Sequence, residues 1–347
     1  MLYIFSIYGE NLKNNNIDNI DNTNICNSNN KNSKNIYYID AHCHMEYRRL
    51  KNRDEVINRA INNNVRMITS GESLGGCKRA LELKKKYPKD IDITMGYHPS
   101  RIKSDWKVVE DTYKFIEKNQ DLVVAVGEIG LDSGITAPTD IQKQEKIFRK
   151  YLNLAMELDK PIVIHARGFE DKAYDIIQEI TKNDLKIIYH CFSGSKQLAE
   201  ELINNDNYIS ISTQLCFSDY HKNLITELLN KYGMDLFKNT LSETDSPFVS
   251  PVKGEQNEPL NVIKVMDEFG KIYNSVFDST NTKNNEYNCN VFNNMKNKLD
   301  NNVINKSNNP GNHIINNQEI NQEINQDDNL IKIAKLIYSQ TKRLFKI

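Results

Sequence analysis

The sequence lacks several features that mark common classes of protein. No stretch approaches the roughly 20 consecutive apolar residues of a membrane-spanning helix, so we expect no membrane partner. The six cysteines form no CxxC pair, and we expect reduced thiols instead of a disulfide framework. The net charge is −1, whereas a passive nucleic-acid binder usually carries a strongly basic face. A nuclease is not excluded, because bound divalent metals bring their own positive charge.

A secretion signal is also missing in its usual form. The first residues, MLYIFSIYG, are apolar, but no basic segment precedes them and Asn-rich sequence follows at once. We therefore expect a cytoplasmic protein, with export by a non-obvious signal as the alternative.

Asparagine is concentrated in two tracts. It accounts for 12 of the 25 residues from 11 to 35 and for 19 of the 50 residues from 281 to 330. Such tracts lack the apolar surface needed to offset the entropy of ordering, so we expect both to be disordered. The sequence then predicts an N-terminal extension over residues 1–35 and one domain over 36–347, interrupted by an insertion at about 276–329. About 260 residues remain, a size typical of a (β/α)8 barrel.

Eight short apolar runs alternate with longer segments of helical spacing. Near-continuous apolarity over four to seven residues is typical of parallel strands buried on both faces. Alternating strands and helices indicate a parallel sheet, and eight strands favour closure into a single TIM barrel. The main rival is a doubly wound sheet, but no GxGxxG follows the first run, which weakens its dinucleotide-binding form. The predicted strands are residues 36–40, 65–70, 91–96, 122–128, 161–165, 186–190, 208–212 and 240–245.

Apolar residues recur at helical spacing between these runs. Clear examples are residues 53–63, 140–158, 196–204 and 220–231. The C-terminal segment from Leu330 shows the same spacing, and we expect it to be the helix that closes the barrel after the insertion.

Five of the seven histidines lie at or just beyond the ends of predicted strands, and His221 and His313 do not. In a TIM barrel the carboxyl ends of the strands form the active site, so these five side chains should converge. Two residues apart on a strand, His42 and His44 would share one face. A chance HxH pair, or single histidines satisfied within the core, is the alternative. The five are His42, His44, His98, His165 and His190.

Carboxylates occupy two further strand ends. Glu128 ends the fourth run in GEIGLD, and Asp245 ends the eighth in LSETDSP, with Glu243 on the same face. A solvated loop acid and a helix N-cap are the respective alternatives. The four histidines from the first, fifth and sixth runs (His42, His44, His165 and His190) and these two carboxylates suit a pair of divalent metals that share a bridging carboxylate. Cys43 and Cys191 adjoin these residues, and we expect both to be packing residues.

The motifs resemble those of TatD-like metal-dependent deoxyribonucleases. They are DAHCH, GYHP, GEIGLD, PIVIHAR, HCFSG, ETDSP and the later QNEP, in this order, over residues 36–275, with residues 330–347 completing the match. Where the family commonly has an aromatic residue after GEIGLD, this sequence has Ser133.

The resemblance implies a role for each site residue. One metal would be held by His42, His44, Glu128 and Asp245, and the second by Glu128, His165 and His190. Contacts to the substrate phosphate would come from His98 and Arg167. Glu128 and Asp245 would be catalytic, Asp245 by orienting water or accepting its proton. The implied activity is hydrolysis of DNA, often as a 3′→5′ exonuclease. It would use two divalent metal ions per chain, which we expect to be Mg²⁺, with Mn²⁺ or Zn²⁺ as alternatives.

Two other functions remain open at this point. One is a metallohydrolase of amides or esters, such as D-aminoacyl-tRNA, because the same metals can polarise a carbonyl group. The other is a non-enzymatic interaction protein that works through its Asn-rich tracts. A substrate panel separates the first from a nuclease, and His165→Ala tests the second. No obligate protein partner is evident in the sequence.

Overall fold

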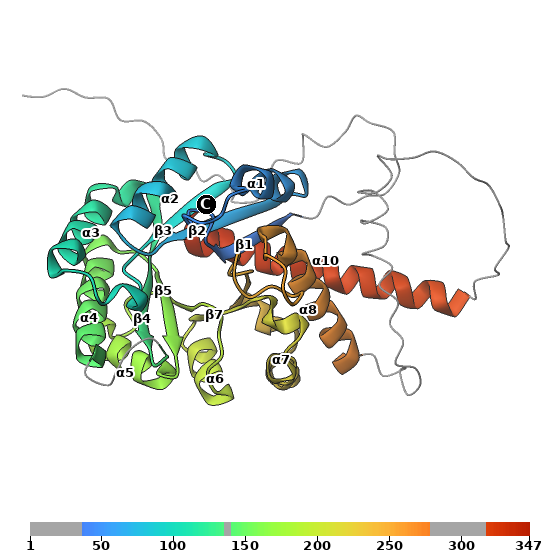
Figure 1. Cartoon of the computed structure of the whole chain (residues 1–347). Coiled ribbons are helices and arrows are strands. Elements are labelled where there is room, and N and C mark those ends of the chain that lie inside the picture. Colours follow the sequence, from blue (N-terminus) through green and yellow to red (C-terminus); the bar gives the residue numbers. More distant parts are fainter. Residues whose placement is uncertain (1–36, 135–139, 278–316) are drawn as a thin grey trace, which may run out of the picture. The chain divides into compact units, whose positions relative to one another are not determined.

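Eight strands form one parallel sheet in which each strand pairs with the next along the chain. The computed structural model describes residues 37–134, 140–277 and 317–347. All eight predicted strands are present, and the predicted TIM barrel is confirmed (Figure 1). The strands are β1 (Tyr38–Cys43), β2 (Val65–Gly71), β3 (Ile91–Met95), β4 (Val123–Asp132), β5 (Ile162–Arg167), β6 (Ile187–Tyr189), β7 (Tyr208–Ile211) and β8 (Thr240–Ser242).

The first and last strands are joined mainly by hydrogen bonds of Asp40 and of the segment after β8. Asp40 accepts from the backbone N–H of Thr244 at 2.8 Å and from its hydroxyl at 2.6 Å. Just beyond, the N–H of Asp245 donates to the carbonyl of His42 at 2.9 Å. These bonds nearly close the barrel and fix the end of β1 against the segment that carries Asp245.

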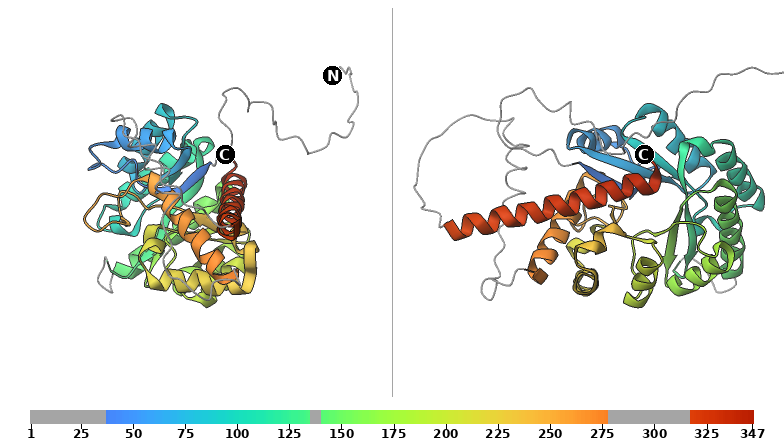
Figure 2. Two further views of the ribbon diagram at one scale, coloured as in Figure 1. Left: turned by 90° about the vertical axis from the view of Figure 1, so that its right-hand side faces the viewer. Right: turned by 180° about the vertical axis from the view of Figure 1, so that it is seen from behind.

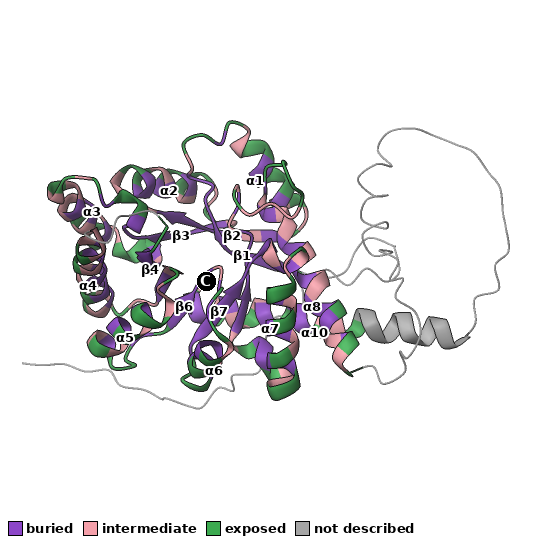
Figure 3. Ribbon diagram, turned by 60° about the horizontal axis from the view of Figure 1, so that its bottom comes forward, coloured by how far each residue is buried: buried purple, intermediate pink, exposed green. Residues whose placement is uncertain are grey.

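Helices surround the barrel, with their apolar faces against the strands and their polar faces outward (Figure 3). In α4, for example, the predicted stripe of Ile147, Phe148 and Tyr151 is buried. The helices that follow strands are α1 (Arg53–Asn62), α2 (Leu74–Lys86), α3 (Trp106–Lys118), α4 (Ile141–Leu158), α5 (Glu170–Thr181), α6 (Lys196–Asn204), α7 (Asp219–Tyr232) and α8 (Val262–Phe277). No helix in the described ranges is both long and apolar enough to span a membrane.

The C-terminal helix α10 (Asn317–Phe345) crosses α8 and packs against it (Figure 2). Near its end, Leu344 and Phe345 join the apolar cluster inside the barrel, which includes Ile39 and Val163. The predicted closing helix is therefore present, but its predicted start at residue 330 is wrong. The Asn-rich composition hid its first part, although Ile320 and Ile324 already follow helical spacing in the sequence.

Several sequence predictions concern residues outside the described ranges. These include the disorder of residues 1–35 and of 281–316, and the status of His313, Cys26 and Cys289. The disorder predicted for the rest of the second tract, residues 317–330, is wrong, because these residues belong to α10. The four described cysteines are free thiols, as predicted.

Candidate metal centre

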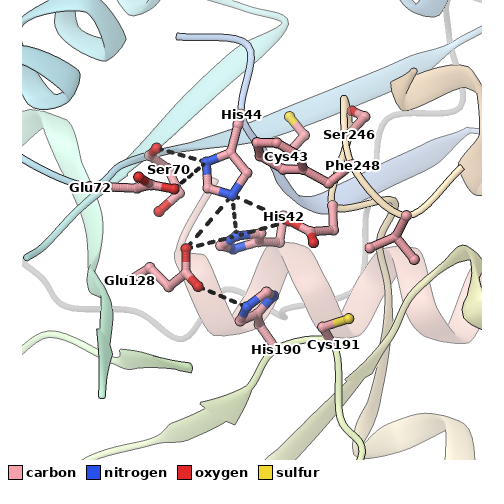
Figure 4. Close-up of polar contacts among 12 residues, drawn as sticks. His42, Cys43, His44, Ser70, Glu72, Glu128, His190, Cys191, Ser246 and Phe248 are labelled. Atoms are coloured by element: carbon pink, nitrogen blue, oxygen red, sulfur yellow. Dashed lines mark hydrogen bonds and ion pairs between the residues drawn. The ribbon is translucent and has the colours of Figure 1, made fainter. Parts of the chain in front are cut away.

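The predicted site residues converge at the carboxyl ends of the strands. Figure 4 shows His42, His44, Glu128 and His190 facing one another there. His190 lies one residue beyond β6, whereas the predicted run ends on it, and His165 lies inside β5, which continues to Arg167. Two carboxylates are also placed differently from prediction. Glu128 lies inside β4, which continues to Asp132, and Asp245 lies in the loop beyond β8. The predicted strand ends were therefore correct for the location of the site but not for the backbone element that carries each side chain.

A bulge in β4 directs Glu128 into the barrel. In the pairing with β5, Gly127 lies opposite Val163 and Ile129 opposite Ile164, so Glu128 is an extra residue between them. A bulge of this kind re-aims the side chain at that position. Two glycines allow the close packing around it. A Cβ on Gly96 would lie 2.6 Å from the carbonyl oxygen of Glu128, and one on Gly130, where φ is +147°, 1.8 Å from that of His165.

The two oxygens of Glu128 face different groups of side chains. Oε2 lies 3.5 Å from Nε2 of His42 and 3.7 Å from Nε2 of His44. Oε1 lies 2.8 Å from Nδ1 of His165 and 2.9 Å from Nε2 of His190. The carboxylate therefore stands between two pairs of histidines.

Asp245 completes the side of the site that holds His42 and His44. Its Oδ1 lies 3.3 Å from Nε2 of His44 and 4.0 Å from Nε2 of His42. Its backbone has a φ of +56°, in the left-handed region that non-glycine residues seldom adopt but Asp tolerates. The N–H bond to the carbonyl of His42 holds the residue there.

Three histidines are oriented by acceptors on the far side of their rings. Nε2 of His165 lies 2.8 Å from Asp132, and Nδ1 of His190 lies 3.3 Å from Glu243. His44 directs Nδ1 toward the carbonyl of Ser70 at 3.3 Å. Acceptors of this kind select the ring nitrogen that is free to bind a metal. Sequence reasoning gave no role to Asp132, whose only signal was its place in GEIGLD.

Charge is balanced within the cluster. Burial alone would raise the pKa of Glu128, but the surrounding histidines, His98 and His190 first, lower it well below its ordinary value. Burial would lower the pKa of His190, whereas Glu128 and Glu243 raise it well above its ordinary value. The pKa of Asp245 is lowered in the same way, because His44 outweighs the effect of burial. The carboxylates are therefore held ionised, as metal binding requires, whereas His190 would have to give up its proton to bind a metal.

These residues fit divalent metal ions. Three groups of donor atoms lie within 4.8 Å of one another: His42, His190 and Asp245; His42, His44 and Glu128; His98, Glu128 and His165. Oε2 of Glu128 is buried and has no hydrogen-bond partner among the described residues. An unpartnered buried carboxylate oxygen is costly unless a cation or another donor satisfies it. Imidazole and carboxylate together suit Zn²⁺, Mn²⁺ or Mg²⁺.

A cavity of about 640 Å³ opens over this cluster. Arg167 is exposed and lines it, as does Arg101, whose guanidinium pairs with Glu72 at 2.9 Å. His98 also lines the cavity. Its Nε2 lies 3.2 Å from Oε1 of Glu128, so this ring contacts the bridging candidate as well as the cavity.

Two minor predictions have mixed outcomes. Cys43 is buried and packs in the core, as predicted. Cys191 instead lines the cavity, with Sγ 3.3 Å from Oε1 of Gln214, because its positive φ of 45° turns the chain after β6. His221 lies on α7, away from the strand ends, but it is buried and its Nδ1 is 2.8 Å from the hydroxyl of Ser218. Replacing it is therefore expected to affect stability.

Two known proteins are similar to this chain in sequence. The chain is 49% identical over 239 residues to an uncharacterized metal-dependent hydrolase of Methanocaldococcus jannaschii, covering 69% of this chain and 90% of the relative. It is 32% identical over 202 residues to the 3′-5′ ssDNA/RNA exonuclease TatD of Salmonella typhimurium, covering 58% of this chain and 75% of that protein.

Solved structures agree on the fold. The TatD homologue YjjV of Escherichia coli superposes with a TM-score of 0.66 at 21% identity, covering 90% of this chain and 99% of the other. A TatD family hydrolase of Entamoeba histolytica gives 0.63 at 19% identity, covering 89% and 98%. Residues 39–293 match the family described as TatD related DNase. The chain is thus an enzyme, a metal-dependent hydrolase that belongs to the TatD family.

Proposed function

We propose that this protein is a deoxyribonuclease that hydrolyses DNA phosphodiester bonds from the 3′ end with two divalent metal ions. Mg²⁺ is the proposed metal, and Mn²⁺ and Zn²⁺ are the alternatives. The observation that carries the proposal is the position of Glu128, with one oxygen toward each pair of histidines. A carboxylate so placed can bridge two ions, an arrangement that clamps the attacking and leaving oxygens of a phosphodiester.

The side chains divide into two sets of ligands. His42, His44 and Asp245 would hold one ion with Oε2 of Glu128. His165 and His190 would hold the other with Oε1, and Asp132 and Glu243 would orient their rings. When bound, the ions supply positive charge that stabilises the phosphoryl oxygens and lowers the pKa of an attacking water.

The remaining steps fall to the protein. Asp245, ionised beside His44, would orient the attacking water and accept its proton. His98 and Arg167 line the cavity beside the cluster and would hold the phosphates of the strand. The exonuclease name of the Salmonella relative supports a nucleic-acid substrate.

The test is hydrolysis of labelled single- and double-stranded DNA and RNA with Mg²⁺, Mn²⁺, Zn²⁺ or chelator. We expect metal-dependent loss of 3′ nucleotides, abolished in His165→Ala and retained in Lys107→Ala, which alters an exposed side chain of α3. Hydrolysis of D-aminoacyl-tRNA or of aryl esters without cleavage of DNA would overturn the proposal in favour of the other metallohydrolase. Full activity in His165→Ala would show that hydrolysis does not depend on the proposed metal centre.

A further inference from the structure

The loop between β1 and α1 carries a run of basic side chains. Residues 47–53 read YRRLKNR, in which four of the seven are Lys or Arg and none is Asp or Glu. Arg48, Arg49 and Lys51 are exposed, and within the part of the chain that the structure describes none of their side chains pairs with an acid or forms a hydrogen bond. Other exposed cations do have partners, such as Lys86 with Asp54 at 2.8 Å. We call Arg48, Arg49 and Lys51 the basic cluster.

Two successive turns place the basic cluster beside the metal centre. The N–H of Tyr47 donates to the carbonyl of His44 at 3.0 Å, and the N–H of Leu50 donates to the carbonyl of Tyr47 at 3.0 Å. Arg48 and Arg49 are the two central residues of the second turn. Such a turn brings the Cα atoms of its first and fourth residues within about 7 Å, and the next Cα is about 3.8 Å further along the chain. The Cα atom of Arg48 therefore lies within about 11 Å of that of His44.

The loop is continuous with the cavity and firmly held. Tyr47, which directly precedes the basic cluster, lines the cavity. Its carbonyl also accepts from Nη2 of Arg53 at 2.9 Å, and the carbonyl of Glu46 accepts from Nε of Arg79 at 2.8 Å. Leu50, in the middle of the loop, is buried. The backbone that carries the basic cluster is thus fixed, so little of its freedom is lost when an anion binds.

The rest of the cavity mouth offers less uncompensated positive charge. The guanidinium of Arg101 is already paired with Glu72 at 2.9 Å, and Arg167 shares the cavity wall with Glu170. The whole chain has a net charge of −1, so a polyanion must be attracted by a local excess of positive charge. Among the loops that adjoin the cavity, the segment of residues 47–53 provides such an excess.

We propose that the basic cluster binds phosphates of the nucleic-acid strand on the 5′ side of the scissile bond and so guides the strand out of the metal centre. This rests on the proposed nuclease function. An enzyme that works from the 3′ end holds the last phosphodiester at the metals, so the preceding phosphates must leave the cavity. A strand rises about 3.4 Å per nucleotide, so a distance of about 11 Å corresponds to roughly three phosphates. Contacts to phosphates position a strand without reading its sequence.

The test is a salt titration of hydrolysis by wild type and by a cluster variant that combines Arg48→Gln, Arg49→Gln and Lys51→Gln. One substrate is a long single-stranded oligonucleotide, and the other is the p-nitrophenyl ester of thymidine 5′-monophosphate, which has no phosphate upstream of its single diester. Each phosphate contact contributes about 0.7 to the slope of log affinity against log salt concentration for single strands. Loss of three contacts should therefore make the slope of log kcat/KM for the oligonucleotide shallower by about 2. At about 0.1 M salt this kcat/KM should fall about 10- to 100-fold, while that of the ester should not change.

Two controls isolate the contact between the basic cluster and the phosphates. Lys85→Gln, Lys114→Gln and Lys118→Gln together remove the same charge from exposed lysines in the C-terminal halves of α2 and α3, and should leave both substrates unaffected. An oligonucleotide with neutral methylphosphonate linkages upstream of the scissile bond should be hydrolysed equally well by wild type and cluster variant.

The outcomes separate this inference from the proposed function. Wild-type enzyme that cleaves the ester but no oligonucleotide would refute the nuclease itself. Oligonucleotide hydrolysis with the same salt slope in wild type and cluster variant would refute only the role of the basic cluster, as would an equal loss in the lysine control. If the cluster variant does not fold, each single substitution should make the slope shallower by about 0.7, and three unchanged slopes would refute the proposal. Loss of binding to phosphatidylserine vesicles, with unchanged oligonucleotide kinetics, would assign the basic cluster to a membrane surface instead.

Discussion

Replacing Gly96 by alanine should displace Glu128 without changing any polar group of the site. The new Cβ would lie 2.6 Å from the carbonyl oxygen of Glu128, 2.7 Å from C of Gly127 and 2.8 Å from N of Glu128. Ordinary contact begins at 3.4 Å, so the backbone of β4 must move by up to 3.4 − 2.6 = 0.8 Å. All three contacts are backbone atoms of one buried strand, so no flexible side chain can absorb the movement.

The movement is large relative to what a metal site accepts. Ligand distances in such sites hold to within about 0.2 Å, and a misplacement of about 1 Å can cost roughly 100-fold in rate. We therefore expect Gly96→Ala to lower metal affinity and DNA hydrolysis by one to two orders of magnitude, with about 1–3 kcal/mol lost in stability from overpacking.

The control is Gly75→Ala, at an exposed position in the first turn of α2. There the added Cβ would meet only Nη1 of Arg79, at 3.3 Å, the far end of a flexible side chain. Stability should rise slightly or stay level, since alanine exceeds glycine in helix propensity by up to about 1 kcal/mol. The assays are metal titration by calorimetry, hydrolysis of labelled DNA and thermal unfolding. Wild-type metal affinity in Gly96→Ala would refute the claim that this contact positions Glu128.

Three further predictions concern other parts of the chain. Asp132→Asn removes the charged partner of His165 and should weaken metal binding about 10- to 100-fold, measured by calorimetry, whereas unchanged affinity would deny it that role. Burial raises the pKa of Asp267 to about 6. The folded state then binds the proton more tightly than the unfolded chain, so this residue makes the free energy of unfolding fall as pH rises from about 4 to 6. Asp267→Asn should be more stable than wild type at pH 8 but not below pH 4, by urea unfolding, and equal stability at pH 8 would contradict this. Replacing residues 280–316 by a short Gly/Ser linker should keep DNA hydrolysis within a few-fold of wild type, and failure to fold would show that the insertion packs on the barrel.

The sequence predicts the barrel and the composition of its site because both depend on periodic features. The apolar run at 161–165 predicts β5 from local sequence alone. A parallel barrel must then bring the end of this strand beside the ends of the other strands. His165 and His190 could therefore be placed near each other although neither has a local motif that requires it.

Local backbone irregularities could not be predicted in this way. The bulge that makes Glu128 an extra residue in β4 depends on packing against β3 and β5, and a strand pattern contains no sign of it. The positive φ of Asp245 depends on a hydrogen bond to β1, about 200 positions earlier in the chain.

The central claim is that Glu128 bridges two metal ions, and counting the ions bound per chain tests it most directly. Metal content and DNA hydrolysis are measured for wild type, Glu128→Gln and the control Glu117→Gln, which alters an exposed carboxylate on α3. We expect two tightly bound equivalents in wild type and control. In Glu128→Gln both ions should bind weakly and the rate should fall at least 10²–10⁴-fold, the range typical of losing one catalytic carboxylate. Two equivalents of metal and a near-normal rate in Glu128→Gln would contradict the account.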